Sequence, residues 1–598
     1  MKKESLKIAL VQFNPVVGNP AYNAERIVGW LDKAKDKGGD FVLFGELVLA
    51  GYCSQDLFFN KDIIKKTQEA WVYIKEVASK KSIGVGLGMP RWNRYSRSGA
   101  KHLFNSFAMF VPDEIEFIQD KVCIPSYGEF DETRWFQSAS IRNVKPRAIG
   151  NKTWGFLICE DGWNNKHGVP DPLYRLYSQD PIERLSKLSK KSNRPLDFFV
   201  NISASPDYIG KQELRLEMNK KIAIHYKTPI IFLNNVGAQD ELIFSGRSFM
   251  LDNKGQVVFE MKAFEEDMKV ISLDNIEKTK AYKPMHKMQE LDGLMGTYLK
   301  DYFNKSKMKS NSGNAKSAQV KTVLGLSGGK DSTAVACILK RHLGQENVLG
   351  IMLPYKMGEY TQPASKKLAE AVANQLGIEV REIAITQAVD DLKKELKVIT
   401  NSLAHQNLQA RIRATILWTI ANQENRVVIN TTNFSEAAMG YGTIGGDLLG
   451  LPLIASLPAT TVIDYLKWLK DQGETAITEE MINRPPSAEL VPGQLDADEL
   501  GAYSYIDPLI ESLRMNYGDI NEVIKHFSKT KSKQNNQYTN TTANKEIFLE
   551  RLSFLAKKLL KDSEFKRWYY NKTPQFTPYS WLRWKWPVAN GYFDILNP

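Results

Sequence analysis

The segment that most restricts the fold of this chain is Val323 to Ser332, VLGLSGGKDS, in which an apolar run meets two adjacent glycines. The apolar run before Ser327 predicts a buried strand, and the apolar spacing from Thr333 to Leu343 predicts the helix that follows. Gly328 and Gly329 can adopt backbone angles that other residues avoid, so their N–H groups can face an anion at the helix N-terminus. We therefore interpret the segment as an ATP-binding loop.

Asp331 lies in the first turn of that helix, where its carboxylate could hold Mg²⁺ bound to a phosphate. The spacing differs from the phosphate loop GxxxxGK[ST], because no Lys-Ser or Lys-Thr pair closes it. The alternative is an ordinary glycine turn between a strand and a helix. The five specified positions of S-G-G-x-D-S, all matched here in the context of a strand and a helix, favour the nucleotide site.

The length and composition indicate a soluble protein with several domains or two large ones. The chain has 598 residues, of which 43% are hydrophobic and 25% are charged. The net charge of +12 comes from lysines spread along the chain, which predicts a solvated surface and no nucleic-acid partner. No apolar run is long enough to span a bilayer, and MKKESLKIALVQF leads directly into a strand pattern. We expect a cytoplasmic enzyme with no membrane partner.

The cysteines give no sign of a metal site or a disulfide framework. They are scattered along the chain without a CxxC pair. The four positions are Cys53, Cys123, Cys159 and Cys337.

The chain is predicted to contain two α/β domains. Residues 1–275 alternate predicted strands with helical stretches, and 320–598 repeat a β-α-β pattern that predicts a parallel sheet with covering helices. Between them, 276–319 is expected to form a connecting helix and a polar linker, because Lys305 to Gln319 is basic and poor in large apolar residues. Ser528 to Lys545, rich in Lys, Asn, Gln and Thr, is interpreted as a surface insertion.

Three residues at the ends of predicted strands in the first domain have complementary chemistry. They are Glu46 in FGELVLAGY, Lys121 in QDKVCIPSYGEFDE and Cys159 in FLICEDGW. An amide hydrolase needs a thiolate nucleophile, a carboxylate that takes and returns its proton, and a cation near the developing oxyanion. Each residue alone has a simpler interpretation, a buried cysteine or a surface charge.

Together the three residues resemble the Glu-Lys-Cys triad of the nitrilase superfamily, and NISASPDYIGK and NNVGAQDELIFSGRS resemble its glutamine-hydrolysing branch. The resemblance implies an α/β/β/α sandwich. It implies that Cys159 attacks the glutamine amide, that Glu46 is the general base and then acid, and that Lys121 stabilises the tetrahedral intermediate. A fourth residue, Glu132 in preference to Glu129, would orient the lysine. The implied glutamine-pocket residues are Tyr127, Ser203 and Arg215, followed by Tyr52.

The second domain resembles a further family. The loop at Ser327 to Ser332 is similar to the pyrophosphatase loop with which ATP-pyrophosphate lyases make acyl-adenylates. Downstream, NLQARIRATILWTIANQ, NTTNFSEAAMGYGT and NRPPSAELVPGQLDAD stand in the order found in NAD synthetases. With the nitrilase-like domain, the chain resembles the glutamine-dependent branch of that family over most of its length. The resemblance implies a Rossmann-like second domain of the adenine nucleotide hydrolase type.

The same resemblance implies ligand contacts in the second domain. Asp331 and Glu436 would hold Mg²⁺. Arg411 would face deamido-NAD, as would Lys566 and Arg567 from a closing segment, although a solvated charge pair is the alternative for the last two. The residues that would bind ATP are Ser327, Gly328, Gly329, Asp331, Ser332, Thr431 and Ser487.

The implied reaction is that of a carbon-nitrogen ligase with glutamine, ATP and deamido-NAD as substrates. The nicotinate carboxylate attacks the α-phosphate of ATP and releases pyrophosphate, and ammonia from glutamine then displaces AMP. Mg²⁺ is the implied cofactor, ATP is a co-substrate, and a homo-oligomer, a dimer or larger, is expected.

The second domain departs from the family pattern between Gly445 and Val462. The family carries a second aspartate after the glycine-rich turn and a lysine further on, whereas this chain keeps Asp447 and offers Gly450 and Ala459. Phe434 also replaces the usual lysine of the TGNKSE-like segment. The missing lysine near the ATP phosphates predicts weaker ATP binding, since a charge-assisted contact contributes about 1.5–3 kcal/mol.

Two alternative functions stay open. The same machinery would amidate a related carboxylate such as nicotinate mononucleotide, which the departures favour. Otherwise the chain would be a nitrilase-type amidase whose second domain senses a nucleotide.

Overall fold

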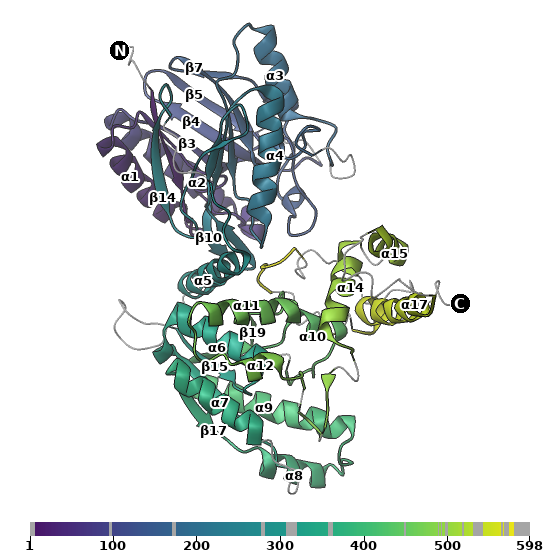
Figure 1. The fold of residues 1–598 in the computed structure, drawn as a ribbon. Coiled ribbons are helices and arrows are strands. Elements are labelled where there is room, and N and C mark those ends of the chain that lie inside the picture. Colours follow the sequence, from purple (N-terminus) through teal and green to yellow (C-terminus); the bar gives the residue numbers. More distant parts are fainter. Residues whose placement is uncertain are drawn as a thin grey trace. The chain divides into compact units, whose positions relative to one another are not determined.

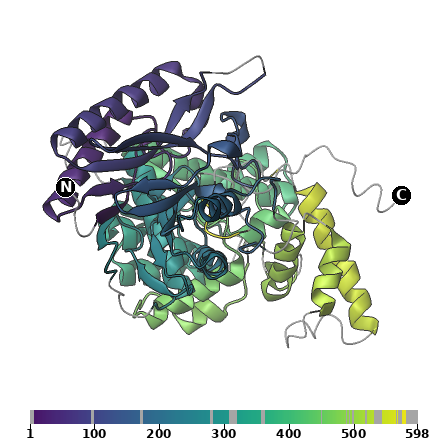
Figure 2. The same cartoon turned by 90° about the horizontal axis from the view of Figure 1, so that it is seen from above.

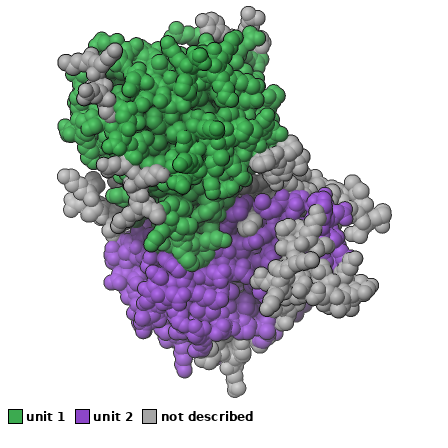
Figure 3. Space-filling model, turned by 45° about the horizontal axis from the view of Figure 1, so that its top comes forward, with its two compact units in different colours: residues 1–305 green, residues 306–598 purple. Residues whose placement is uncertain are grey.

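The chain divides into two compact units, Met1–Lys305 and Ser306–Pro598 (Figure 3). Most of the expected linker and part of the expected surface insertion lie outside the residues that the structure describes. The computed structural model describes residues 6–94, 99–169, 175–276, 282–306, 320–356, 363–447, 450–487, 489–491, 493–496, 500–516, 519–529, 542–563, 566 and 573–578.

The first unit is a four-layer sandwich in which two sheets face each other and helices cover both outer faces (Figure 1 and Figure 2). The alternation of side chains along each strand builds these layers. In β1 (Lys7–Gln12), Ile8 and Leu10 enter the core between the sheets, while Ala9 and Val11 pack in the cluster that contains helices α1 and α2. The expected α/β/β/α sandwich is confirmed.

Each sheet of the sandwich has six strands. The first has the order β14-β1-β2-β3-β4-β5, and the second has the order β13-β12-β9-β8-β7-β6, with β10 and β11 forming a separate hairpin. Besides β1, the strands are β2 (Phe41–Leu43), β3 (Gly84–Trp92), β4 (Leu103–Val111), β5 (Ile115–Asp120), β6 (Arg147–Ile149), β7 (Lys152–Ile158), β8 (Phe198–Ser203), β9 (Ile230–Asn234), β10 (Val236–Gln239), β11 (Leu242–Ser245), β12 (Phe249–Leu251), β13 (Val257–Glu260) and β14 (Asp267–Ser272).

The helices of the first unit flank the sheets, except for the last one. Helix α5 (Lys287–Lys305) packs on the hairpin β10–β11, so the first compact unit continues past residue 275 and includes the connecting helix expected within 276–319. The other helices are α1 (Pro20–Asp36), α2 (Lys61–Lys80), α3 (Pro181–Lys191) and α4 (Lys211–Tyr226), with short turns η1 (Gln55–Phe59), η2 (Glu132–Arg134), η3 (Ile141–Asn143) and η4 (Cys159–Gly162).

The second unit is built on a parallel sheet of five strands with the order β17-β16-β15-β18-β19. Strand order reverses between β15 and β18, and the loops that leave their carboxyl ends define the crevice where such sheets bind ligands. The segment 326–329 follows β15, and residues 431–433 follow β18. The strands are β15 (Lys321–Gly325), β16 (Val348–Met352), β17 (Glu379–Glu382), β18 (Arg426–Asn430) and β19 (Leu451–Pro452).

Helices surround this sheet, and a second apolar cluster lies on α10, α11, α14, α15 and α17. None of the described helices is long and apolar enough to cross a membrane. The helices are α6 (Lys330–Leu343), α7 (Pro363–Leu376), α8 (Thr386–Glu395), α9 (Leu403–Glu424), α10 (Phe434–Met439), α11 (Ala459–Asp471), α12 (Glu479–Asn483), α14 (Tyr503–Met515), α15 (Ile520–Lys529) and α17 (Thr542–Lys557), with turns η6 (Gln345–Asn347) and η7 (Lys558–Asp562).

The backbone of Glu46 lies directly over Gly88 of β3. A Cβ atom at Gly88 would come within 2.6 Å of Glu46 Cα and 2.2 Å of Leu47 N. We therefore expect Gly88→Ala to lower the free energy of unfolding by about 1–3 kcal/mol, the usual cost of overpacking. Urea unfolding followed by tryptophan fluorescence measures this cost. Gly29→Ala is the control, because no atom lies within 4 Å of its Cβ; an equal loss in both variants would contradict the prediction.

Candidate active sites

The first candidate site lies where strands of both sheets of the first unit end. Glu46 follows β2, Lys121 follows β5 directly, and Cys159 follows β7 directly. Since β2, β3 and β5 run in the same direction, their carboxyl ends meet at one edge of the sheet. The charges of Glu46 and Lys121 both act on the Cys159 thiol of the second sheet, so the three residues of the predicted triad lie in one site, and all three are buried.

The Lys121 ammonium lies between two buried carboxylates. Its Nζ donates to Glu46 Oε1 at 2.7 Å and to both Glu132 oxygens at 2.9 Å. Asn105 on β4 donates from Nδ2 to Glu46 Oε1 at 2.7 Å and to Glu132 Oε2 at 3.3 Å. The second Glu46 oxygen, Oε2, accepts from the Ala204 N–H at 2.9 Å. These bonds fix the orientation of the Glu46 carboxylate.

Burial and charge set the protonation states of this cluster. Burial lowers the pKa of Lys121, but Glu132 and Glu46 outweigh it and raise that pKa well above its usual value. Burial and then Glu46 raise the pKa of the Cys159 thiol. The resting site therefore contains a protonated lysine and a protonated thiol, and the thiol becomes a nucleophile when a base takes its proton.

Cys159 lies on a strained turn. Its φ is +44°, a conformation that side chains other than glycine rarely adopt. The buried Asp161 carboxylate holds this turn, because it accepts from the N–H groups of Cys123 at 2.8 Å, Val122 at 3.1 Å and Ile158 at 3.3 Å. The turn therefore presents Cys159 at the end of β7.

Two of the predicted glutamine-pocket residues lie beside this cluster. Tyr127 donates from its hydroxyl to Glu160 Oε2 at 2.9 Å, and Glu160 directly follows Cys159. Burial raises the pKa of Glu160 to about 7, while Lys121, Tyr127 and Lys211 lower it. Ser203 is buried at the end of β8, next to Ala204. The Glu160 carboxylate and the Tyr127 phenol therefore lie beside Cys159, where a polar substrate could contact them.

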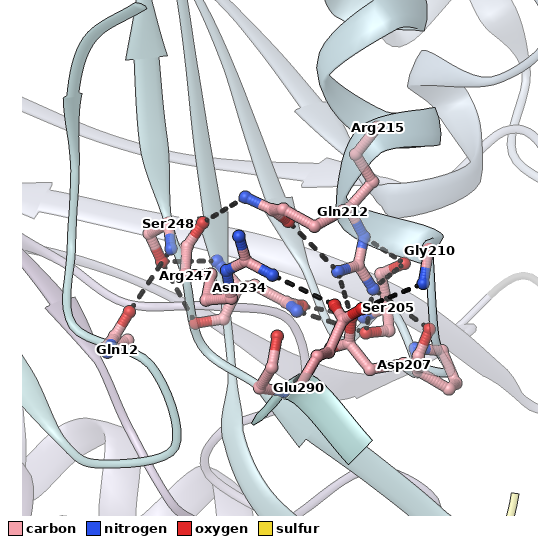
Figure 4. Close-up of polar contacts among 12 residues, drawn as sticks. Gln12, Ser205, Asp207, Gly210, Gln212, Arg215, Asn234, Arg247, Ser248 and Glu290 are labelled. Atoms are coloured by element: carbon pink, nitrogen blue, oxygen red, sulfur yellow. Dashed lines mark hydrogen bonds and ion pairs between the residues drawn. The ribbon is translucent and has the colours of Figure 1, made fainter. Parts of the chain in front are cut away.

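Arg215 has a different environment from the one predicted. It is fully buried on α4, and its donors are used by Asp207 Oδ1 at 2.5 Å, the Ser205 carbonyl at 2.7 Å and the Pro206 carbonyl at 3.0 Å (Figure 4). In this structure Arg215 supports the loop after β8. Its contact with a substrate stays a prediction.

The second candidate site is the loop between β15 and α6. Gly328 has a φ of +78°, and an added Cβ would come within 2.7 Å of the Ser365 carbonyl and of Ala369 N on α7. The Ser327 hydroxyl accepts from Gly329 N at 3.2 Å and lies 3.1 Å from the Ser332 hydroxyl. The predicted strand, glycine turn and helix are confirmed, and α7 packs so closely that glycine is required at residue 328.

Asn433 connects the two predicted metal ligands. It donates from Nδ2 to Asp331 Oδ1 at 3.1 Å and accepts at Oδ1 from Glu436 N at 2.9 Å. Glu436 accepts in return from Asn433 N at 3.2 Å, which completes a capping box at the start of α10. The loops after β15 and β18 are thereby joined at the point where strand order reverses.

The carboxylates of this site raise one another's proton affinity. Burial raises the pKa of Asp331 to about 6, with a further contribution from Asp496. Burial, Asp331 and Asp496 raise the pKa of Glu436 well above its usual value. Among the described residues, no group of three or more acidic, histidine or cysteine side chains could hold a metal ion. Two carboxylates fit Mg²⁺, which usually takes one or two from protein and others from phosphate.

The remaining predicted nucleotide contacts are spread over the second unit. Thr431 follows β18, two residues before Asn433. Ser487 accepts from Glu489 N at 3.1 Å, and Arg411 is exposed on α9. Lys566 donates to the carbonyls of Gly440 at 2.7 Å and Gly442 at 2.9 Å, and Arg567 lies outside the described residues.

The two positions at which the sequence analysis expects lysines in the family are buried here. Phe434 is 1% exposed and Ala459 is 6% exposed, and both belong to the apolar cluster on α10, α11 and α14. Tyr503 and Ile506 of α14 lie in the same cluster. That these two residues replace lysines of the family pattern stays a prediction, but a lysine introduced at residue 459 would have to leave this core.

Three polar residues of these sites were not predicted. Asn105 and Asp496 carry no local sequence signal, because each acts through distant partners. Asn433 could have been found, since N-x-x-E before a helical run is a capping-box signature.

Lys330 links the ATP loop to the end of α12 by donating to the Arg484 carbonyl at 2.5 Å.

The fold and the two sites define a class of two-domain enzymes. The sequence model of the carbon-nitrogen hydrolase family matches residues 7–281, and that of the NAD synthase family matches residues 303–548. The chain belongs to the family of glutamine-dependent NAD(+) synthetases, as the following relatives show.

A relative from Synechocystis sp., named glutamine-dependent NAD(+) synthetase, is 34% identical over 86% of this chain and 90% of its own length. A relative of the same name from Thermotoga maritima is 30% identical over 84% of this chain and 88% of its own length. A solved glutamine-dependent NAD+ synthetase from Acinetobacter baumannii, in complex with ADP, superposes with a TM-score of 0.70 at 25% identity and covers 99% of both chains. The resemblance inferred from the sequence is confirmed.

The raised pKa of Asp331 makes cation binding depend on pH. Its carboxyl is charged above about pH 6, and a divalent cation must displace the proton below that value. We expect Mg²⁺ to bind at least tenfold more weakly at about pH 5 than at about pH 8, as measured by titration calorimetry. Asp331→Ala should abolish this binding, whereas Asp391→Ala, at an exposed residue of α8, should not change it. Binding independent of pH would contradict the assignment.

Proposed function

We propose that this enzyme is a carbon-nitrogen ligase that converts deamido-NAD, ATP and glutamine into NAD, AMP, pyrophosphate and glutamate. The observation that carries the glutamine half is the buried Lys121 ammonium held between Glu46 and Glu132, at the strand ends that also present Cys159. Family membership supports the same reaction.

In the first unit, Cys159 attacks the glutamine amide carbon while Glu46 takes the thiol proton. The positive charge of Lys121 stabilises the developing oxyanion. Glu46 then returns its proton to the leaving nitrogen, and ammonia departs as the thioester forms. Water, activated by Glu46, hydrolyses the thioester to glutamate and restores the thiol.

In the second unit, the N–H groups of Gly328 and Gly329 and the hydroxyls of Ser327 and Ser332 bind the phosphates that leave as pyrophosphate. Asp331 and Glu436 would hold Mg²⁺, which neutralises phosphate charge when bound. The nicotinate carboxylate forms the acyl-adenylate at the α-phosphate, and ammonia displaces AMP. Thr431, Ser487, Arg411, Lys566 and Arg567 are the proposed further contacts to ATP and deamido-NAD.

One observation supports a second candidate, amidation of a related carboxylate such as nicotinate mononucleotide. Phe434 and Ala459, at the positions where lysines are expected, are buried in an apolar cluster and supply no cation to the synthetase site. The third possibility, an amidase with a nucleotide-sensing domain, predicts no AMP.

We also propose that the enzyme is a cytoplasmic homo-oligomer with Mg²⁺ as cofactor. The large apolar side chains of Ile399, Leu403 and Trp418 are exposed on α9 and just before it. Exposed apolar side chains of this kind are common where two subunits associate. All four cysteines are free, which suits a reducing compartment and a thiol nucleophile.

Cys159→Ala should abolish glutamine-supported synthesis and leave ammonium-supported synthesis within about twofold of the wild type, because the nucleophile serves only nitrogen release. NAD formation measured with each nitrogen source tests this. Cys123→Ala, at a buried cysteine without a proposed role, is the control. Synthesis from glutamine in the Cys159 variant would remove the triad assignment.

The acceptor is identified by assaying the purified enzyme with ATP, Mg²⁺ and glutamine against deamido-NAD and nicotinate mononucleotide side by side. We expect deamido-NAD to be used with at least about a tenfold higher kcat/KM, since the ATP loop, Glu436 and Arg411 are all present. AMP and amide should form in equal amounts. Preference for the mononucleotide would support the second candidate, and the absence of AMP with both acceptors would support the third.

A further inference from the structure

Two buried arginines form a network beside the first active site (Figure 4). Arg247 donates from NH1 to Glu290 Oε1 at 3.0 Å and from Nε to Glu260 Oε1 at 2.9 Å. Gln212 joins this pair to Arg215, because it donates to Glu260 Oε1 at 2.9 Å and to the Arg247 carbonyl at 3.0 Å and accepts from Arg215 at 3.4 Å. No step of the proposed reaction uses Arg247, Glu290 or Glu260.

Glu290 is the residue by which α5 enters this network. It is 3% exposed, and its Oε2 accepts from the N–H of Gly210 at 3.0 Å. Gly210 has a φ of +84° and is the N-cap of α4, where it ends the loop that begins at Ala204. Helix α5 is the last element of the first unit, so the chain that continues to the ATP loop leaves from the same helix.

The other end of that loop contacts the general base. The Ala204 N–H donates to Glu46 Oε2, the oxygen that Lys121 does not use. Arg215 holds the intervening residues by bonds to Ser205, Pro206 and Asp207, and Asp207 Oδ2 also accepts from Ser245 N at 2.7 Å. The loop is therefore fixed at both ends and in its middle, with one end at Glu46 and the other at Glu290.

We infer that Glu290 is a positioning residue of the first active site: from α5 it holds the loop 204–210, and through that loop it sets the orientation of the Glu46 carboxylate. The inference rests on the proposed glutamine hydrolysis. A charged Glu290 accepts hydrogen bonds from both Arg247 and Gly210. When its carboxyl group is neutral, one oxygen carries a proton, and one of the two hydrogen bonds is weakened.

The charges around Glu290 define how its role should vary with pH. Burial raises its pKa to about 7, the Gly210 N–H and Arg247 lower it, and Asp207 and Glu213 raise it. Arg247 in turn faces Glu260 and Tyr282. The carboxyl is thus charged above about pH 7 and neutral below it, so the loop is held most firmly at alkaline pH.

Glu290→Gln tests the inference, because glutamine keeps the shape and stays neutral at every pH. We expect kcat for ammonia release from glutamine to fall about tenfold at about pH 8, with KM within about twofold, and to converge on the wild-type value at about pH 6. Ammonium-supported synthesis should not change. Glu217→Gln is the matched control and should keep the wild-type profile, since Glu217 is exposed on α4 and pairs with Lys221.

Glu290→Asp keeps the charge and carries the test if the glutamine variant does not fold. It should retain the wild-type dependence on pH at reduced activity. Parallel pH profiles for Glu290→Gln and the wild type, or an equal loss of ammonium-supported synthesis, would overturn the inference. If the wild-type enzyme releases no ammonia from glutamine, the proposed function fails instead, which keeps the two outcomes distinguishable.

Discussion

The ion pairs of the Lys121 ammonium with Glu46 and Glu132 are the contacts on which the first active site depends. Two carboxylates buried this close to each other would be costly without a cation, and removing one member of such a group leaves a charge without compensation. Glu46 follows β2, Lys121 follows β5 and Glu132 begins η2. The two ion pairs therefore also hold these three segments together. Catalytic geometry and local stability therefore have a single physical origin here.

The second active site also contains buried carboxylates, but no side-chain cation is bonded to Asp331 or Glu436 among the contacts described above. Asp331 and Glu436 are joined by Asn433, a neutral side chain, and their pKa values rise because burial and the neighbouring Asp496 disfavour the charged forms. Lys330 is the nearby cation, but it donates to the Arg484 carbonyl. The excess negative charge favours a cation from solution. The first site carries its own counter-charge, whereas in the proposed function the second would acquire it together with the nucleotide.

The sequence was sufficient for features that depend on local pattern. The strand before Ser327, the glycine turn and the helix after it were predicted from this pattern, whereas the sandwich was implied by the resemblance to the nitrilase superfamily. In the structure, alternation along β1 and β2 separates the inner core from the helix layers. The Asn105 contacts and the burial of Arg215 could not be predicted, since both depend on residues far along the chain. The membership of α5 in the first unit follows from its packing on β10 and β11, which no local pattern reveals.

The shared burial of Phe434 and Ala459 has a consequence for how this enzyme can change. Because both side chains pack in one apolar cluster with Tyr503 and Ile506, a lysine at either position would place a charge in that core. A substitution at one position therefore acts on the packing that surrounds the other. A lysine at residue 434 or 459 would therefore need compensating changes within the same cluster before the fold tolerated it.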